Sequence, residues 1–196
     1  MSIADLFRKS CEIFPESIAV SMGVQQWTYR QLDAESNRLV DQLKSFGVVR
    51  GDIVAISFSR GFEQISSLLA LLKMGVAYLP LDADYPTDRL RYMLAQSQTK
   101  LLLTQKKYVS LFSDLNIHIA TIETEKTVEL VNKTQVNELK ISAVKPFSLF
   151  AAENRQILPK DWSQIIYVLY TSGSTGKPKG IAMGEAALEN MISLQN

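Results

Sequence analysis

Apolar runs alternate with amphipathic segments between residues 52 and 122 of the chain. Four short runs have the length and composition of buried β-strands: DIVAISF (52–58), AYLPL (77–81), KLLLT (100–104) and IHIATI (117–122). Between them, FEQISSLLALLKMG (62–75) and DRLRYMLAQS (88–97) have helical spacing, and QKKYVSLFSDL (105–115) has it more weakly. The alternation predicts βαβ units, and therefore an α/β fold with a mainly parallel sheet and flanking helices.

Capping and turn residues mark several predicted helix ends. Thr28 and Gln31 have the spacing of a capping box at the start of a helix. Gly47 and Gly75 are placed to end helices, because glycine adopts the left-handed conformation of a C-terminal cap at little cost. Thr87 is the predicted N-cap of the helix that follows it.

The rest of the chain is less regular. A helix is predicted over 2–14, a β-hairpin over 17–29, a buried strand over QIIYVLYTS (164–172), a short strand over GIAM (180–183) and a helix over EAALENMISLQ (185–195). Residues 124–163 are polar and have poor periodicity. They are interpreted as a long, variable connection with at most one helix, TVELVNKTQVNEL (127–139).

Composition narrows the function classes. The chain has 196 residues and a formal net charge of +1, so no global charge attracts it to nucleic acid or to a membrane. Its single cysteine, Cys11, and single histidine, His118, allow no disulfide and no His/Cys metal site. No stretch reaches the ~18 apolar residues of a membrane span, and the N-terminus lacks the apolar core of a signal peptide. The expected location is the cytoplasm, with no metal site, nucleic-acid partner or membrane partner.

One stretch, YTSGSTGKPKG (170–180), carries the candidate chemistry. A predicted strand leads into it, and open α/β sheets bind ligands at the carboxyl ends of their strands. Glycines allow a backbone to approach a ligand closely, and successive N–H groups then form an anion nest. The hydroxyl, glycine and lysine residues predicted to bind a polyphosphate are Thr171, Ser172, Gly173, Ser174, Thr175, Gly176, Lys177 and Lys179. A flexible Ser/Gly/Thr linker is the alternative, but the buried strand before the loop and the KPKG after it favour phosphate binding.

Two familiar phosphate loops are excluded. A Walker loop reads G-x-x-x-x-G-K-[ST], but Thr171 stands where the first glycine belongs and Pro178 follows Lys177. The dinucleotide fingerprint G-x-G-x-x-G fails in the frame of Gly173, because Thr175 replaces its second glycine. Pro178 also disfavours a helix that runs directly out of the loop.

The loop resembles the phosphate-loop signature of the adenylate-forming enzymes, which include acyl-CoA synthetases, luciferases and the adenylation domains of nonribosomal peptide synthetases. LLKMGVAYLPLDADYPTDRLRYML (71–94) resembles the second core motif of amino-acid adenylation domains. WTYRQLDAESNRLVDQLKSFGVVRGDIVAI (27–56) resembles the first motif, and LFRKSCEIFPESIAV (6–20) resembles their opening segment. The resemblance implies that residues 1–196 are a partial AMP-binding (adenylation) domain. Much of 105–163 does not take part in the resemblance.

The resemblance implies a reaction and its participants. In this family an amino acid attacks the α-phosphate of ATP, with Mg²⁺ as cofactor, to give an aminoacyl-AMP and pyrophosphate. The acyl group then passes to a phosphopantetheine thiol on a carrier protein, as a step of secondary metabolite biosynthesis. By this resemblance Lys179 is the catalytic, phosphate-facing lysine and residues 171–176 form the cradle, whereas the position of Lys177 varies in the family.

One position departs from the family pattern. Many relatives place a histidine about five residues after the KPKG segment, where this chain has Glu185, although Asn190 is retained. A carboxylate has the wrong sign beside a substrate carboxylate and a triphosphate. Glu185 points away, reports a different substrate, or marks a copy that is no longer active. Asp82, Asp84 and Asp88 are interpreted as turn and surface residues rather than catalytic groups.

The resemblance covers only the first part of the family's large domain. The amino-acid pocket, the adenine and ribose contacts and the small C-terminal lid domain have no counterpart in the chain, so its amino acid is unreadable. An amino-acid-activating ligase, inactive as a fragment, is the favoured function. The alternatives are a fragment of an acyl or aryl acid–CoA ligase and a non-catalytic remnant that at most binds nucleotide.

Overall fold

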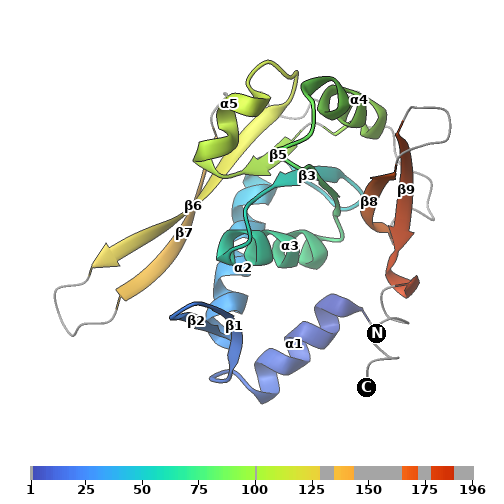
Figure 1. Cartoon of the computed structure of the whole chain (residues 1–196). Helices are drawn as coiled ribbons and strands as arrows, with labels where there is room; N and C mark the ends of the chain where they lie inside the picture. Colours follow the sequence, from blue (N-terminus) through green and yellow to red (C-terminus); the bar gives the residue numbers. More distant parts are fainter. Residues whose placement is uncertain (1, 100, 129–134, 144–164, 172–177, 188–196) are drawn as a thin grey trace.

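The computed structural model describes residues 2–99, 101–128, 135–143, 165–171 and 178–187 (Figure 1). The helices are α1 (Ile3–Ile13), α2 (Tyr29–Ser45), α3 (Phe62–Met74), α4 (Thr87–Ser97), the 3-10 turn η1 (Lys106–Tyr108) and α5 (Val109–Phe112). The strands are β1 (Ile18–Met22), β2 (Gln25–Thr28), β3 (Ile53–Ser57), β4 (Ala77–Pro80), β5 (Leu101–Thr104), β6 (His118–Val128), β7 (Gln135–Ala143), β8 (Ile165–Thr171) and β9 (Lys179–Gly184). These bounds confirm the elements predicted over residues 52–122.

Most of the described strands form one sheet, in the order β7-β6-β5-β3-β4-β8-β9, and β1 and β2 form a separate hairpin. Neighbours from β6 to β8 run parallel to one another. In this sheet the two edge strands, β7 and β9, pair antiparallel. The predicted α/β fold with a mainly parallel sheet is therefore confirmed.

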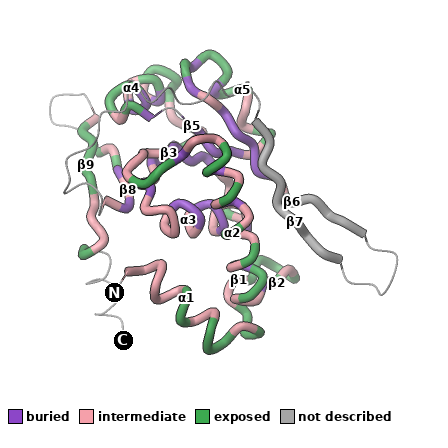
Figure 2. The backbone as a smooth tube through the Cα atoms, turned by 180° about the vertical axis from the view of Figure 1, so that it is seen from behind, coloured by how far each residue is buried: buried purple, intermediate pink, exposed green. Residues whose placement is uncertain are grey.

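Helices cover both faces of the sheet, with α2 and α3 on one face and α4 and α5 on the other (Figure 1). In strand β3, Val54 and Ile56 join the core on the α2–α3 side, whereas Ala55 joins the core on the α4–α5 side. The central strands are consequently buried on both faces (Figure 2). This two-sided burial explains why their sequences are continuously apolar rather than alternating.

Local signals set several helix ends. Thr28 Oγ1 accepts the Gln31 N–H at 3.2 Å and Gln31 Oε1 accepts the Thr28 N–H at 2.9 Å, which confirms the capping box at α2. Gly75 ends α3 in the left-handed conformation with φ of 65°, as predicted. The predicted N-cap at Thr87 is wrong, because Thr87 is already the first residue of α4 and Pro86 takes the cap position. The constrained φ of proline suits the start of a helix.

The helix predicted over 127–139 is wrong where the structure describes it. Strand β6 continues to Val128, and β7 returns antiparallel beside it, with Ala120 opposite Ala143 and Val128 opposite Gln135. This β6–β7 hairpin projects from the body of the molecule (Figure 1). The HIATIETEKTV segment of β6 is rich in β-branched residues, which lose side-chain freedom in a helix and suit a pleated strand.

One lysine connects the N-terminal helices. Lys73 Nζ, in the last turn of α3, lies 2.7 Å from Asp33 Oδ1, 2.6 Å from Ser36 Oγ and 2.8 Å from Asn37 Oδ1, all on α2. The ammonium group also lies over the Phe7 ring of α1, 5.4 Å from its centroid. The Lys73 side chain is only 16% exposed, so these acceptors compensate a charge that has lost most of its water.

Candidate functional site

The glycine-rich loop leaves the sheet from the end of β8. Strand β8 runs parallel to β4, with Tyr167 opposite Tyr78, so the loop begins at the carboxyl edge of the parallel strands. Strand β9 then returns antiparallel along β8. The sheet therefore places the loop at the edge where open α/β sheets bind their ligands, as the sequence predicted.

The two ends of the loop face each other. Thr171, the last residue of β8, pairs in register with Lys179, the first residue of β9. This pairing brings together a hydroxyl and a cation, two of the groups that the sequence assigned to a polyphosphate. The other predicted phosphate-binding residues, Ser172, Gly173, Ser174, Thr175, Gly176 and Lys177, lie outside the described residues.

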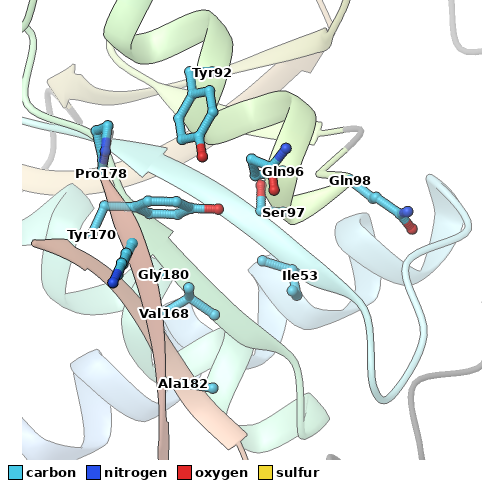
Figure 3. A pocket seen from close by; sticks show the side chains of 11 residues that line it. Ile53, Tyr92, Gln96, Ser97, Gln98, Val168, Tyr170, Pro178, Gly180 and Ala182 are labelled. Atoms are coloured by element: carbon cyan, nitrogen blue, oxygen red, sulfur yellow. The ribbon is translucent and has the colours of Figure 1, made fainter. Parts of the chain in front are cut away.

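A cavity of about 560 Å³ lies beside this hairpin, between α4 and the strands β8 and β9 (Figure 3). Val168 and Ala182 form an apolar part of its wall, and Tyr92 and Gln96 of α4 add polar groups. Lys179 also lines this half-open cavity, although it is an exposed residue. The volume falls within the range of small-molecule sites.

A tyrosine that the sequence interpretation did not single out occupies the base of the loop. Tyr170 precedes Thr171, and its hydroxyl donates to the backbone carbonyl of Met93 in α4 at 3.3 Å. Its ring lies against Gly180, its cross-strand partner (Figure 3). A Cβ atom at Gly180 would lie 3.1 Å from the Tyr170 Cζ, so a larger residue would require the ring to shift by a few tenths of an ångström.

The environment of Tyr170 keeps its hydroxyl a donor. Burial raises the pKa of Tyr170 above its usual value of 10.0, and the nearby Tyr92 raises it further. The phenol therefore stays protonated throughout the neutral range. The sequence could have predicted that Tyr170 points inward, because it shares the inward face of β8 with Val168. Its contact with Gly180 could not be predicted without the strand register.

Glu185 lies just after β9 and does not stand free. Its Oε1 accepts the backbone N–H of Ile3 at 2.9 Å, in the first turn of α1. The N-terminus of a helix carries a partial positive charge, so the carboxylate is in a favourable electrostatic position. Of the three interpretations offered by the sequence, this contact supports a carboxylate that is directed to α1.

The aspartates of the DADYPTDR segment behave as turn and surface groups, as predicted. Asp82 Oδ1 accepts the N–H of Asp84 at 3.0 Å, which is an Asx-type turn contact. Asp88, with 96% of its side chain exposed, pairs with Arg91 at 2.8 Å. Exposed pairs of this kind add little stability and no special chemistry.

The comparison with protein families decides the affiliation of the chain. The AMP-binding enzyme family matches residues 7–196. The chain belongs to the AMP-binding enzyme family. The resemblance that the loop and the two core motifs carry is thereby confirmed.

The curated relatives of this chain include peptide synthetases. Bacitracin synthase 3 of Bacillus licheniformis is 36% identical over 193 residues, and tyrocidine synthase 1 of Brevibacillus parabrevis is 33% identical over 192 residues. Each match covers 98% of the chain, but only 3% of the first relative and 16% of the second. The chain thus spans a small part of the length of the curated relatives it matches.

A solved structure shares the fold of this chain. The N-terminal subdomain of Klebsiella oxytoca NpsA superimposes with a TM-score of 0.64 at 22% sequence identity, over 94% of this chain and 42% of that chain. This likeness confirms that the chain is a mixed α/β segment of an adenylate-forming fold.

The described part of the chain also bears on membranes and metals. In the described ranges, no helix combines the length and the apolar character needed to cross a bilayer. Within the same ranges, no cluster of three or more His, Cys, Asp or Glu side chains is arranged to hold a metal ion.

Proposed function

We propose that this chain provides the site that binds the phosphates of ATP in a ligase. The ligase activates an amino-acid carboxylate as an aminoacyl-AMP. The observation that carries the proposal is the pairing of Thr171 with Lys179 at the two ends of the glycine-rich loop. A hydroxyl and an ammonium group at the carboxyl edge of the sheet, beside a cavity of about 560 Å³, fit an anionic guest. The peptide-synthetase relatives, at 36% and 33% identity, support the amino acid as the substrate class.

The chemistry assigned to these residues is electrostatic. A carboxylate oxygen of the amino acid attacks the α-phosphorus of ATP, the bond from that phosphorus to the bridging oxygen breaks, and pyrophosphate leaves. Negative charge grows on the leaving β and γ phosphates during this step. Lys179 and the hydroxyl of Thr171 would stabilise that charge, together with the loop N–H groups. Mg²⁺ is expected with the nucleotide, because it is commonly held by substrate phosphates and few protein ligands.

The same proposal includes the fate of the product. In a peptide synthetase the aminoacyl group passes from AMP to the phosphopantetheine thiol of a carrier protein, with formation of a thioester and release of AMP. The carrier is therefore the proposed macromolecular partner, alongside ATP and the amino acid.

Calorimetric titration of the chain with Mg·ATP tests the polyphosphate site. Lys179→Ala is expected to weaken binding about tenfold, because a charge-assisted hydrogen bond contributes about 1.5–3 kcal/mol. Lys9→Ala is the matched control, since Lys9 is an exposed lysine on α1, outside the hairpin. The control should bind Mg·ATP like the unaltered chain.

Two results would contradict the proposal. One is a lack of measurable Mg·ATP binding by the unaltered chain. The other is equal binding by the Lys179→Ala and Lys9→Ala variants, which would show that the hairpin lysine does not face the phosphates.

A further inference from the structure

Tyr170 lies on β8 at the base of the glycine-rich loop and contacts the neighbouring strand β9. It is the residue immediately before Thr171, and its ring lies against Gly180, the residue immediately after Lys179. Gly180 Cβ, if present, would lie 3.1 Å from the ring Cζ and 3.3 Å from its hydroxyl oxygen. Tyr170 is therefore one residue from Thr171 along β8, and its ring contacts the residue that follows Lys179 on β9.

The same side chain fixes the hairpin to the body of the domain. The Tyr170 hydroxyl donates to the carbonyl of Met93 at 3.3 Å, and Met93 is only 1% exposed on α4. The two residues are 77 positions apart in the chain. Met93 and Tyr170 belong to the same hydrophobic core on the α4 side of the sheet, so the anchor lies in a packed region.

We propose that Tyr170 is a positioning residue for the phosphate loop. Its ring, held against Gly180, and its hydroxyl, held by Met93, fix where β8 and β9 release the two ends of the loop relative to α4. The inference rests on the proposed function, in which Thr171 and Lys179 bind the phosphates of ATP. Binding groups must be held close to their productive geometry by neighbours that are themselves fixed by packing.

Gly180 follows from the same packing. An added methyl group meets the aromatic ring rather than a flexible chain end, so the ring has to move. A ring shifted by a few tenths of an ångström changes its contact with Met93 and moves the side chain that adjoins Thr171 on β8. Gly180→Ala should therefore disturb the loop from the opposite strand, without altering any donor to phosphate.

The test uses two variants and one matched control. Tyr170→Phe removes the hydroxyl bond to Met93, and Gly180→Ala displaces the ring. Tyr167→Phe is the control, because it removes a hydroxyl from the same strand. Tyr167 packs against Tyr78 on the α3 side, with ring centroids 5.6 Å apart. Circular dichroism gives the melting temperature of each protein, and calorimetry at 15 °C gives its affinity for Mg·ATP and for inorganic tripolyphosphate.

We expect Tyr170→Phe to weaken both ligands about threefold and Gly180→Ala about tenfold, with Tyr167→Phe unchanged. A merely structural tyrosine would lower the melting temperature and leave the affinity of the folded protein at 15 °C as it was. If Tyr170→Phe does not fold, Gly180→Ala tests the same contact from β9.

The outcomes separate the two proposals. If the unaltered chain binds Mg·ATP and loses affinity on Lys179→Ala, but Tyr170→Phe and Gly180→Ala bind normally, the positioning role is overturned and the proposed function stands. If the unaltered chain binds neither ligand, the proposed function falls and the positioning role falls with it.

Discussion

At the scale of single residues, Glu185 illustrates how a departure from a family pattern acquires a physical explanation. The sequence has a carboxylate where the resemblance implies a histidine, near a predicted triphosphate. The structure gives that carboxylate a partner 182 positions away, the N–H of Ile3 at 2.9 Å. The contact satisfies one of the N–H groups that every helix leaves unpaired at its N-terminus.

The role of Glu185 is testable by its effect on stability. Glu185→Ala should lower the free energy of unfolding by about 1 kcal/mol, because it removes an acceptor for α1 and a favourable charge at its N-terminus. Glu185→Gln retains an acceptor and should cost less. Urea denaturation measures both, with Glu12→Ala as control, since Glu12 is exposed and lies 3.8 Å from Arg8. Equal midpoints for Glu185→Ala and the control would contradict the contact.

Cys11 provides a prediction on pH dependence. Burial raises the pKa of its thiol above the ordinary value of 9.0, and Asp33 raises it further, although Lys73 acts in the opposite direction. A raised pKa means less thiolate at a given pH below it. The native chain should therefore react more slowly with a disulfide reagent at pH 8 than the chain unfolded in guanidinium.

The pH profile of that reaction supplies the control. The rate of the native chain should still rise at a pH where the rate of the unfolded chain has already levelled off. Because Cys11 is the single cysteine of the chain, the signal has one source. A native rate that reaches its plateau at or below the pH of the unfolded plateau would contradict the raised pKa.

At the scale of elements, Lys73 of α3 connects α3 to α2 through hydrogen bonds to three side chains of α2. Lys73→Met keeps the length of the side chain but leaves Asp33, Ser36 and Asn37 without their shared donor. The variant should lose about 1–3 kcal/mol of stability, since hydrogen bonds to charged groups contribute about 1.5–3 kcal/mol and Asp33 remains 35% exposed.

Chemical denaturation distinguishes this role from a general loss of charge. Lys44→Met is the control, because Lys44 is an exposed residue at the end of α2. The control should shift the urea midpoint little, while Lys73→Met lowers it with an unchanged slope. A shift for Lys73→Met no larger than that of the control would show that the cluster contributes nothing measurable.

The elements also show what sequence reasoning could and could not predict. The buried strands β3 and β5 were readable because both faces are covered, which leaves a continuous apolar run. The start of β6 was predicted, but its extension to Val128 and its pairing with β7 were missed, because polar residues with β-branched neighbours give weak periodicity and the antiparallel pairing with the next strand decided the conformation. The phosphate-binding role of Thr171 and Lys179 was proposed from the loop chemistry and stays a prediction, whereas the contact of Tyr170 with Gly180 depends on strand register.

At the scale of the whole molecule, the described candidate phosphate-binding residues, Thr171 and Lys179, lie at the carboxyl edge of the parallel strands. Strands β3, β4, β5 and β8 all end there, and the helices on both faces hold their register through two separate cores. This arrangement gives the loop between Thr171 and Lys179 a base that is packed on both faces of the sheet. Such a base supports the proposed binding of phosphates, but catalysis also requires a second reactant held at the α-phosphate.

This distinction leads to a prediction for the polypeptide of residues 1–196. It should bind Mg·ATP but should show no amino-acid-dependent exchange of pyrophosphate into ATP, because the site described here includes no groups assigned to the amino acid. The fold match to the NpsA subdomain spans 42% of that chain, which leaves much of the relative's structure without a counterpart here. The assay mixes radiolabelled pyrophosphate, Mg·ATP and each proteinogenic amino acid in turn, with an intact peptide synthetase as the positive control. Exchange above the background of the Lys179→Ala variant with any amino acid would show that these residues suffice for activation, and it would name the substrate.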